Sequence, residues 1–336
     1  MSAGAPHASE PLRRLLVQPD DGVEAVLELL ASARESLRLK QFTLTQHDVL
    51  DALIHAHRKG IEVRVMLNQH RASGHRVNDE THEKLHAHGV KVAWANPEFD
   101  ITHEKSVQVD DDAALIATFN MAKKYFGHTR DYGIVTRDPA QLAEIRRCFD
   151  ADWKRETFRP SHGSGLAWSA DNSRPTMAGL IDGARRRLDI QHPKFVDATI
   201  LDRIAEAQHR GVHVRLLSGG KHGISGADAP DTFSSLRILR RAGVEVKRQK
   251  HLKLHAKMMV ADGTRVLLGS MNIDHRSFDA RRELGIVLED QPIVERLSAI
   301  FAHDWKEAES YQPPDPLDVA SHAHGELPDD PDFEHD

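Results

Sequence analysis

The chain contains 336 residues, of which 40% are hydrophobic, and it carries a formal charge of −6. This length suffices for two domains, and no apolar run approaches the roughly 18 residues that a membrane-spanning helix needs, so we expect any membrane contact to be peripheral. The single cysteine, Cys148, excludes an internal disulfide, and residues 1–16 lack the apolar segment of a secretory signal. These features predict a cytoplasmic protein, with peripheral contact at the inner membrane face as an open possibility.

Predicted helices and strands alternate along the chain, and the same order occurs twice. Each half begins with a helix, a short strand, a second helix that ends at a glycine, and a β-branched strand, and a further helix and strand follow. Such alternation is typical of an α/β protein with a mostly parallel sheet covered by helices on both faces. The predicted helices include 24–37, 48–60, 176–188 and 199–211, and the predicted strands include 37–42, 61–67, 90–94, 188–192, 212–218 and 244–249.

An internal duplication explains this repeated order. Several pieces of the first half recur in the second half at a constant offset of 152 residues (255 − 103 = 152). They are His103 and His255, Asn120 and Asn272, RDYGIV at 130–135 and RELGIV at 282–287, and DADWK at 150–154 and AHDWK at 302–306. A repeat of this length predicts two tandem α/β domains related by a pseudo-twofold axis, with a shared site at their interface.

Composition shifts along the chain place the expected domain boundaries. The segments are an N-terminal segment 1–22, a first domain 23–158, a linker 159–175, a second domain 176–310 and an acidic tail 311–336. The tail holds eight Asp and Glu but no Lys or Arg, and we expect it to be disordered. Without it the formal charge would be +2 (−6 + 8), which is too small for the basic surface that non-specific nucleic-acid binding uses.

The tetrapeptide THEK occurs at 81–84 and at 102–105, and the two copies begin different motifs. The first copy continues to His86 as H-E-x-x-H, in which His82 and His86 lie one helical turn apart and can bind zinc while Glu83 activates a water. The equivalent helix of the second half has no such motif, and the flanking residues are polar. We therefore predict a solvated helix face here and no metal site.

The second copy begins the pattern H-x-K-x4-D, which occurs once in each half. The two sets are His103, Lys105 and Asp110, and His255, Lys257 and Asp262. On a strand, a histidine and a lysine two residues apart project to the same face. Two such pairs across a pseudo-twofold axis would surround a phosphodiester with a nucleophile, an acid and two cations, with no metal or other cofactor.

Further polar residues occur at equal spacing in the two halves. Asp131 and Glu283 each follow the histidine of their own half by 28 residues (131 − 103; 283 − 255), and we predict that these acids orient the imidazoles. Hydroxyl and amide side chains at the end of the next strand are predicted to bind phosphate, whereas the motif aspartates are assigned to structure. The phosphate-binding candidates are Thr118, Asn120, Ser270 and Asn272, and the structural acids are Asp110 and Asp262.

The duplicated H-x-K-x4-D pattern followed by G-S-x-N resembles the phospholipase D superfamily, and residues 255–278, HAKMMVADGTRVLLGSMNIDHRSF, are similar to its cardiolipin synthase branch. The resemblance implies two phospholipase D-like α/β domains and a covalent phosphohistidine intermediate. It assigns the nucleophile to His103, the general acid and then base to His255, and phosphate binding to Lys105, Lys257, Asn120 and Asn272. The first half departs from G-S-x-N with residues 117–120, ATFN, in which Thr118 keeps the hydroxyl.

The catalytic pattern by itself does not choose a substrate within this superfamily. Resemblance to the synthase branch favours a phosphodiesterase or phosphatidyltransferase that acts on glycerophospholipids, with water or an alcohol as acceptor. Four aromatic residues are candidates either for a lipid-contacting rim or for the core: Tyr125, Phe126, Phe195 and Phe233. A nuclease is the alternative, which the aromatic content of 5% and the near-neutral body disfavour. A phosphate-binding module without catalysis is a third possibility.

Overall fold

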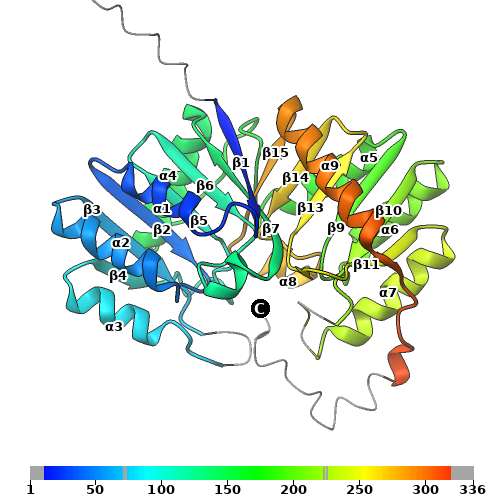
Figure 1. Cartoon of the computed structure of the whole chain (residues 1–336), viewed down its shortest axis with the longest axis horizontal. Helices are drawn as coiled ribbons and strands as arrows, with labels where there is room; N and C mark the ends of the chain where they lie inside the picture. The colour runs from blue at the N-terminus through cyan, green and yellow to red at the C-terminus, as the bar shows by residue number, and fades with distance from the viewer. Residues whose placement is uncertain (1–10, 71–73, 222–223, 225, 319–336) are drawn as a thin grey trace, which may run out of the picture.

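The computed structural model describes residues 11–70, 74–221, 224 and 226–318. They form two α/β lobes that lie side by side, each built on an eight-stranded sheet (Figure 1). The tail predicted to be disordered lies outside the described residues from 319 onward. The duplication in the sequence therefore corresponds to two lobes of the same architecture, and the predicted α/β fold class is confirmed.

The first sheet runs in the order β1-β7-β6-β5-β2-β3-β4, with β12 added beside β7. The pairs β2–β3 and β3–β4 are parallel, and the other neighbours along this path are antiparallel. The strands are β1 (Arg13–Gln18), β2 (Ser36–Gln41), β3 (Glu62–Leu67), β4 (Lys91–Trp94), β5 (Ser106–Val109), β6 (Ala113–Ala117), β7 (Thr129–Thr136) and β12 (Lys253–Leu254).

The second sheet runs in the order β16-β11-β10-β9-β13-β14-β15-β8, with the parallel pairs β9–β10 and β10–β11 and antiparallel pairs elsewhere. Its strands are β8 (Leu166–Trp168), β9 (Arg187–Gln191), β10 (His213–Ser218), β11 (Glu245–Arg248), β13 (Met258–Ala261), β14 (Arg265–Gly269), β15 (Leu284–Leu288) and β16 (Glu309–Ser310). The expectation of mostly parallel sheets is wrong. The pairs β5–β6 and β13–β14 are antiparallel and joined by short turns, and the next strands, β7 and β15, also run antiparallel to the strands before them, whereas parallel pairing needs a crossover connection.

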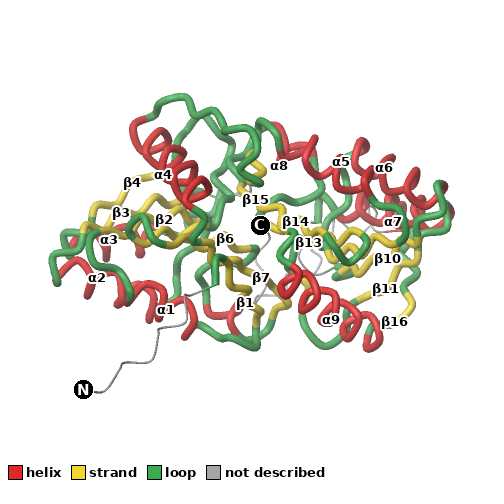
Figure 2. The backbone as a smooth tube through the Cα atoms, turned by 90° about the horizontal axis from the view of Figure 1, so that it is seen from above, coloured by secondary structure: helices red, strands yellow, loops and turns green. Residues whose placement is uncertain are grey.

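Helices cover both sheets, as Figure 2 shows from above. The first lobe contains α1 (Glu24–Ala31), α2 (His47–Arg58), α3 (Asp79–Ala87), a 3-10 turn (Lys123–Phe126) and α4 (Pro139–Lys154). The second contains α5 (Ser173–Gly183), α6 (Ala198–His209), α7 (Ala229–Arg241), α8 (His275–Asp279) and α9 (Gln291–Glu307). None of the helices in the described part of the chain combines the length and the apolar character needed to cross a bilayer.

Alternation along the strands divides the apolar side chains among three cores. In β6, Leu115 packs in a core confined to the first lobe, whereas Ala114 and Ile116 belong to a core that contains residues of both sheets. In β14, Leu267 packs within the second lobe, whereas Leu268 belongs to the shared core. Because successive strand residues face opposite sides of the sheet, each central strand contributes side chains both to the core of its own lobe and to the core shared between the lobes. The two lobes are joined by this common core.

Two edge strands lie outside the domain boundaries expected from the sequence. The strand β1 belongs to the predicted N-terminal segment and pairs with β7, and β8 belongs to the predicted linker and pairs with β15. Trp168 of β8 is fully buried, and its indole Nε1 donates a hydrogen bond to Glu144 at 2.7 Å. The polar residues around β8 concealed a three-residue strand whose burial depends on contacts far away in sequence.

The motif aspartates hold local turns in place. Each lies directly after a strand with a positive φ, 50° for Asp110 and 56° for Asp262. The carboxylate of Asp110 accepts hydrogen bonds from the backbone N–H groups of residues 34–36, and that of Asp262 accepts them from residues 185–187. Although burial opposes the charged form, these N–H groups lower the pKa of both carboxyls. These contacts suit the structural role predicted for the two acids.

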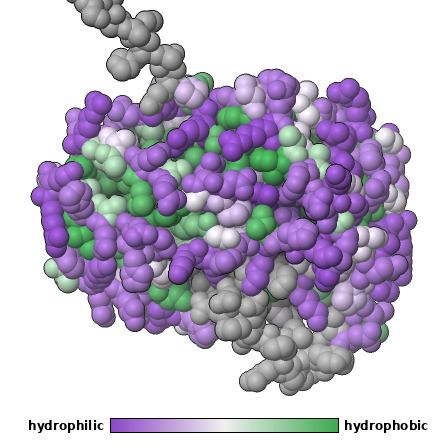
Figure 3. Space-filling view, in the orientation of Figure 1, coloured by the Kyte–Doolittle hydropathy of each residue, from purple (hydrophilic) through white to green (hydrophobic). Residues whose placement is uncertain are grey.

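The aromatic residues considered for a lipid-contacting rim lie in the interior. Tyr125, Phe126, Phe195 and Phe233 all have exposed fractions of 9% or less. Of the two alternatives, the core position is the correct one for these four side chains, because the helix and loop positions that carry them face the cores of their lobes. The face of the molecule in Figure 3 is largely hydrophilic, with hydrophobic residues in scattered groups.

Candidate active site

The two H-x-K segments approach the interface as extended chain just before a strand. His103 and Lys105 precede β5, and His255 and Lys257 precede β13, so the motif lies before the strand rather than within it. All four side chains are buried, with exposed fractions between 0% and 4%. The backbone N–H groups of His103 and Glu104 donate to the carbonyl of Arg282 at 2.9 Å, which fixes the first segment against the second lobe.

The second segment is held in the same way by the first lobe. The N–H groups of His255 and Ala256 donate to the carbonyl of Arg130 at 3.3 and 2.9 Å. The carbonyl acceptors Arg130 and Arg282 are themselves 152 residues apart (282 − 130). Each lobe therefore binds the histidine segment of the other lobe through backbone hydrogen bonds that obey the pseudo-twofold symmetry.

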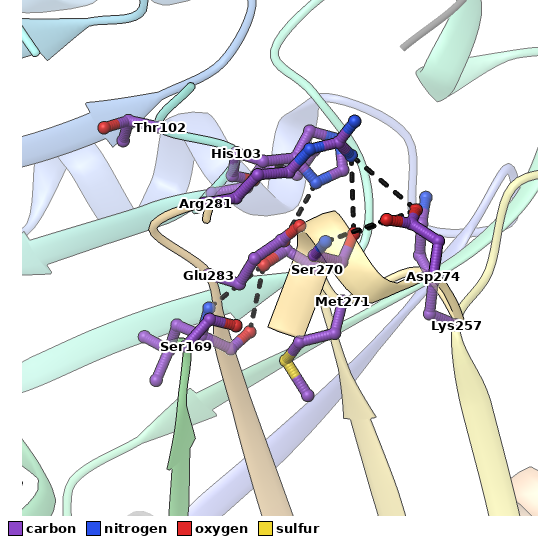
Figure 4. A network of polar contacts seen from close by, with 12 residues as sticks. Thr102, His103, Ser169, Lys257, Ser270, Met271, Asp274, Arg281 and Glu283 are labelled. Atoms are coloured by element: carbon purple, nitrogen blue, oxygen red, sulfur yellow. Dashed lines mark hydrogen bonds and ion pairs between the residues drawn. The ribbon is translucent and has the colours of Figure 1, made fainter. Parts of the chain in front are cut away.

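The imidazole–carboxylate pairs cross between the lobes. His103 Nδ1 lies 2.9 Å from Glu283 Oε2, and His255 Nδ1 lies 2.7 Å from Asp131 Oδ1. The equal spacing in sequence had associated each acid with the histidine of its own half, but the structure pairs each acid with the histidine of the other half. Figure 4 shows Glu283 directed toward His103 across this interface. Neither histidine meets its acid within a single half of the chain.

The ionised form of each acid selects one tautomer of its imidazole. An ionised carboxylate accepts a hydrogen bond, so Nδ1 then carries the proton and Nε2 is directed elsewhere, as a nucleophile or a general base requires. Lys257 Nζ lies 2.8 Å from His255 Nε2 and also donates to the carbonyl of His255 at 2.7 Å. Lys105 Nζ donates to the carbonyl of His103 at 2.7 Å and lies 5.2 Å from the ring centre of Phe42. Each imidazole thus has a carboxylate on Nδ1, and each histidine residue accepts a hydrogen bond from a lysine at its carbonyl.

A second set of crossed pairs holds the two acids in position. Arg130, which precedes Asp131, donates from Nε and Nη2 to the carboxylate of Asp304 at 2.8 and 3.1 Å. Arg282, which precedes Glu283, donates from Nη2 to Asp152 at 3.0 Å. Asp152 and Asp304 are again 152 residues apart (304 − 152), and the four side chains are buried. Each Arg-acid dipeptide therefore contacts the opposite lobe twice, once through a salt bridge and once at the histidine.

Burial changes the ionisation of one orienting acid. Burial raises the pKa of Glu283 to about 7, and the nearby positive charges of Lys105 and Arg281 oppose this rise. Near neutral pH this carboxyl therefore exchanges between a protonated and an ionised form. The ionised form can accept a charge-assisted hydrogen bond from His103 Nδ1 and stabilise a positive imidazole, which the neutral form does less well.

The hydroxyl groups predicted to bind phosphate lie against the acids. Thr118 Oγ1 donates to Asp131 Oδ1 at 2.6 Å, and Ser270 Oγ donates to the carbonyl of Leu284 at 3.3 Å. Hydrogen bonding from Ser270 also lowers the pKa of Glu283 against the effect of burial. These contacts favour a role in orienting the acids, and phosphate binding stays a prediction for Asn120 and Asn272. Asn272 is 4% exposed, and no described residue pairs with its Oδ1.

Close approach of a neighbouring strand explains why the second G-S-x-N motif begins with glycine, Gly269. A Cβ at Gly269 would collide with the backbone of Leu284 and Gly285 on the neighbouring strand β15. In the first lobe the equivalent pair of strands places Ala117 opposite Gly133. Ala117 packs in the core of the first lobe, so the departure from G-S-x-N occurs where the backbone accommodates one methyl group.

The first histidine of the H-E-x-x-H helix packs against a neighbouring strand. His82 stacks on Trp94 with ring centres 4.3 Å apart, and its pKa is lowered by burial and by the neighbouring His86. Among the described residues, the side chains close enough to share an ion are Glu104, Cys148 and Asp152. Lys40 Nζ already contacts all three, at 2.8, 3.2 and 2.7 Å.

Several of these residues carry no signal of their own in the sequence. Four of them lie inside the repeated segments, where the offset of 152 residues is visible: Arg130, Arg282, Asp152 and Asp304. An alignment of the two halves does not show that these residues form salt bridges between the lobes. Lys40 has no such signal, because its structural equivalent in the second lobe is Gln191. These two residues occupy matching positions, since Lys40 pairs with Ser106 and Gln191 with Met258, which are 152 residues apart.

Two duplicated lobes that share two imidazole–carboxylate pairs and two lysines define the phospholipase D-like class of proteins. Residues 26–153 and 177–305 match the family model described as "Cardiolipin synthase, PLD-like domain". These matches cover most of both halves, and the chain belongs to this family of phospholipase D-like enzymes. The resemblance read from the sequence motifs is thereby confirmed.

Individual relatives agree with this assignment. Cardiolipin synthase A of Pseudomonas aeruginosa is 26% identical over 340 residues, which cover 90% of this chain and 68% of that protein. Major cardiolipin synthase ClsA of Bacillus subtilis is 26% identical over 338 residues, which cover 84% of this chain and 67% of that protein. The chain thus spans about two thirds of the length of these relatives.

Solved structures show the same two-lobed fold at low sequence identity. Phosphatidylserine synthase of Haemophilus influenzae superposes with a TM-score of 0.74 at 13% identity, covering 93% of both chains. Polyphosphate kinase of Porphyromonas gingivalis superposes with a TM-score of 0.71 at 17% identity, covering 96% of this chain and 55% of that chain. At these identities the likeness establishes the fold and leaves the substrate to be argued from the site.

Proposed function

We propose that the protein is a metal-independent enzyme that transfers or hydrolyses the phosphatidyl group of glycerophospholipids through a phosphohistidine intermediate. The observation that carries the proposal is the crossed arrangement of two imidazole–carboxylate pairs, in which each histidine residue is also hydrogen-bonded to the lysine of its own motif. This arrangement supplies a nucleophile, a proton donor and two fixed cations, which together meet the needs of phosphoryl transfer.

In the first step, His103 Nε2 attacks phosphorus and forms a P–N bond while the P–O bond to the headgroup alcohol breaks. The leaving oxygen takes a proton from the His255 imidazolium, so a neutral alcohol departs. Lys105 and Lys257 neutralise charge on the non-bridging oxygens, and the amides of Asn120 and Asn272 fix their orientation. The choice of His103 as nucleophile follows the resemblance to the phospholipase D superfamily.

In the second step, His255 takes a proton from the acceptor, whose oxygen then attacks phosphorus as the P–N bond breaks. An alcohol acceptor gives a new phospholipid, and water gives phosphatidic acid. Both outcomes use the same intermediate, so access of water and of the acceptor to His255 decides between them. The acids contribute by stabilising the positive imidazoles that form in each step: Glu283 for His103 and Asp131 for His255.

Lipid as the substrate is supported by the family and by the printed names of its relatives. The matched family model is that of cardiolipin synthase, the curated relatives are cardiolipin synthases, and one structural neighbour is a phosphatidylserine synthase. A cytoplasmic location with peripheral contact to the inner membrane face is part of the same proposal, because a phosphatidyl group must reach the interface between the lobes from a lipid surface.

Mass spectrometry of lipid products tests the proposal. The protein is incubated in EDTA with vesicles of phosphatidylglycerol and phosphatidylethanolamine, with and without glycerol, beside His103→Ala and His255→Ala variants. We expect cardiolipin, phosphatidic acid or a headgroup-exchanged lipid with the wild type and none with either variant. Products that persist in both variants would contradict catalysis by these histidines.

The same preparation distinguishes the alternatives. Degradation of plasmid or single-stranded DNA in EDTA, with loss in His103→Ala and no lipid product, would support a nuclease instead. Binding of phosphate or phospholipid that is equal in the wild type and both histidine variants, with no product of either kind, would support a non-catalytic binding module. Vesicle flotation measures the peripheral contact directly.

A further inference from the structure

The second lobe carries a buried arginine for which the first lobe has no equivalent. Arg281 immediately precedes the Arg282-Glu283 dipeptide, and the residue 152 positions earlier is Thr129 (281 − 152). Thr129 is a neutral side chain that donates to the carbonyl of Tyr125 at 3.1 Å. The chain therefore places one extra positive charge on a single side of its pseudo-twofold axis.

Backbone hydrogen bonds place this arginine on the side of His103. The N–H of Asp100 donates to the carbonyl of Ala280 at 2.9 Å, and that of Arg282 donates to the carbonyl of Ile101 at 3.1 Å. Residues 280–282 thus run beside residues 100–103. Figure 4 draws Arg281 in the same network of polar contacts as His103 and Glu283. The positive charge of Arg281 lowers the pKa of Glu283, which is the acid that pairs with His103 Nδ1.

The guanidinium is enclosed but sparsely hydrogen-bonded. Arg281 is 3% exposed, which is comparable with the catalytic lysines and histidines. Its Nη1 donates to Ser277 Oγ at 3.3 Å and lies 3.9 Å from Asp274 Oδ2, and no described residue pairs with its Nε. A guanidinium offers five N–H donors, and leaving donors buried without acceptors is costly. The arginine is therefore placed to accept an anionic partner.

The charge of Arg281 helps to stabilise the Asp274 carboxylate, but this contact occupies only one edge of the guanidinium. The carboxylate of Asp274 already accepts hydrogen bonds from Ser277 N at 2.8 Å and Ser277 Oγ at 3.1 Å, and Lys194 Nζ lies 2.9 Å from it. The Arg281 contact, at 3.9 Å, is the longest of these. Although burial opposes ionisation, Arg281 and Lys194 lower the pKa of Asp274 to about 2. Asp274 thus anchors one edge of the guanidinium and leaves the rest available.

We propose that Arg281 is a third cationic ligand for the phosphate group of the substrate, acting on the side of His103 alone. The proposal deepens the proposed function, because it adds a residue to the binding of the reacting phosphodiester. Arg281 presents planar, paired N–H donors that match two oxygens of a phosphate, whereas Lys105 and Lys257 act as point charges. The site is then asymmetric, with three cations arranged unequally around two equivalent histidines.

Binding of inorganic phosphate tests the proposal separately from lipid chemistry. Isothermal titration in EDTA compares the wild type with Arg281→Gln, Arg281→Lys and Arg276→Gln. Arg276 is the matched control, because it lies on the same segment but is exposed and paired with Asp100. We expect Arg281→Gln to raise Kd for phosphate by about tenfold to hundredfold, the usual worth of hydrogen bonds to a charged group, with Arg281→Lys intermediate and Arg276→Gln unchanged.

The opposite results are equally clear. A wild-type Kd in Arg281→Gln, an equal loss in Arg276→Gln, or no phosphate binding by the wild type would overturn the proposal. If Arg281→Gln fails to fold, Arg281→Lys keeps the charge and still separates paired hydrogen bonding from a structural role. In lipid assays Arg281→Gln should raise KM more than it lowers kcat. Loss of phosphate affinity without any lipid turnover by the wild type would refute the proposed function and leave this inference standing.

Discussion

Arg130 donates two hydrogen bonds to the carboxylate of Asp304 in the other lobe. The next residue of the same strand, Asp131, pairs with His255, which also belongs to the other lobe. Asp304 also accepts a hydrogen bond from Gln191 at 3.0 Å. The salt bridge and the imidazole–carboxylate pair are therefore adjacent parts of one interface, and a change in the first is transmitted to the second through a single peptide unit. The contacts that join the lobes therefore lie next to the residues proposed to act in catalysis.

Asp304→Asn should be strongly destabilising. The side chains of Arg130 and Asp304 are 8% and 6% exposed, and removing one partner of a buried pair costs about 3–5 kcal/mol because the other charge stays buried. The control Asp100→Asn breaks an ion pair with Arg276 in which both side chains are 47% exposed, and it should cost less than about 1 kcal/mol. Urea unfolding measures both values, and equal small changes would show that the buried pair does not hold the lobes together.

The crossed pairs predict which acid behaves like which histidine. If His103 forms the covalent intermediate, Glu283→Gln should reduce the amount of trapped phosphohistidine, as His103→Ala does. Asp131→Asn should instead resemble His255→Ala and slow the proton transfers to the leaving and accepting alcohols. Rapid quenching with labelled substrate followed by detection of acid-labile phosphate distinguishes the two groups. Grouping of Asp131→Asn with His103→Ala would contradict the pairing across the lobes.

Activity should fall as the pH drops below about 7. Burial raises the pKa of Glu283 to about 7, so the ionised form that supports His103 is present above this pH and is lost below it. Glu283→Gln removes the titration and should flatten this limb of the pH profile while lowering kcat. A rate profile between pH 5 and pH 9 with saturating substrate tests the prediction, and an unchanged acid limb in the variant would reject Glu283 as its source.

The same pKa shift has an opposite sign for stability. The folded protein holds a proton on Glu283 up to about pH 7, whereas the unfolded chain releases it near the ordinary value of 4.5, so folding becomes less favourable as the pH rises between these values. Glu283→Gln avoids this loss. At pH 8 its Tm should equal or exceed that of the wild type, and the difference should shrink below pH 5. A variant that is less stable at pH 8 than at pH 4.5, relative to the wild type, would contradict this sign.

Lys40→Gln should destabilise the first lobe. Glutamine is the residue that the second lobe has at the equivalent position, Gln191. The acidic residues around Lys40 nevertheless require a positive charge in the first lobe. In the first lobe Lys40 lies 2.8 Å from Glu104 and 2.7 Å from Asp152, and although burial disfavours its charge, Asp152, Cys148 and Glu104 raise its pKa. Removing the ammonium leaves two buried carboxylates facing each other, at a cost of several kcal/mol.

The measurement for this variant is thermal unfolding beside Arg215→Gln. Arg215 contacts the buried Asp189 at 2.8 Å through a partly exposed guanidinium, so its loss should be milder. A double variant, Lys40→Gln with Glu104→Gln, should recover part of the lost stability because one of the two facing charges is removed. No recovery would show that Lys40 acts through packing rather than through charge.

The sequence predicted the fold because the signals that it uses are local or repeated. Helix patterns such as 48–60 and β-branched runs such as 61–67 correspond to α2 and β3 within two residues. The predicted helix 24–37 was too long, because Ser36 and Leu37 belong to β2, where a buried strand is required between β3 and β5. Sheet direction was wrong because pairing partners depend on how the chain returns, which no short window contains.

The candidate site was predicted as a set of residues but not as a set of contacts. Duplication identified His103, His255 and both acids, since each recurs at the offset of 152. The contacts between the lobes could not be predicted in this way. An internal alignment matches equivalent positions in the two halves, but it does not show whether a residue contacts its own half or the other half. Arg281 was missed for the opposite reason: it has no equivalent, and a search based on repetition passes over whatever occurs once.

Crossed contacts also bear on the history of this chain. In an isolated half the histidine and the acid would both be present, but they would not contact each other. Two identical copies could form both pairs through a twofold-symmetric interface, in which each copy contributes its acid to the histidine of the other. Fusion of two copies makes that association permanent and independent of concentration. In the fused chain, equivalent positions of the two halves can differ. Lys40 is equivalent to Gln191, and Arg281 is equivalent to Thr129. A symmetric dimer of identical chains could not carry such a difference on one side only.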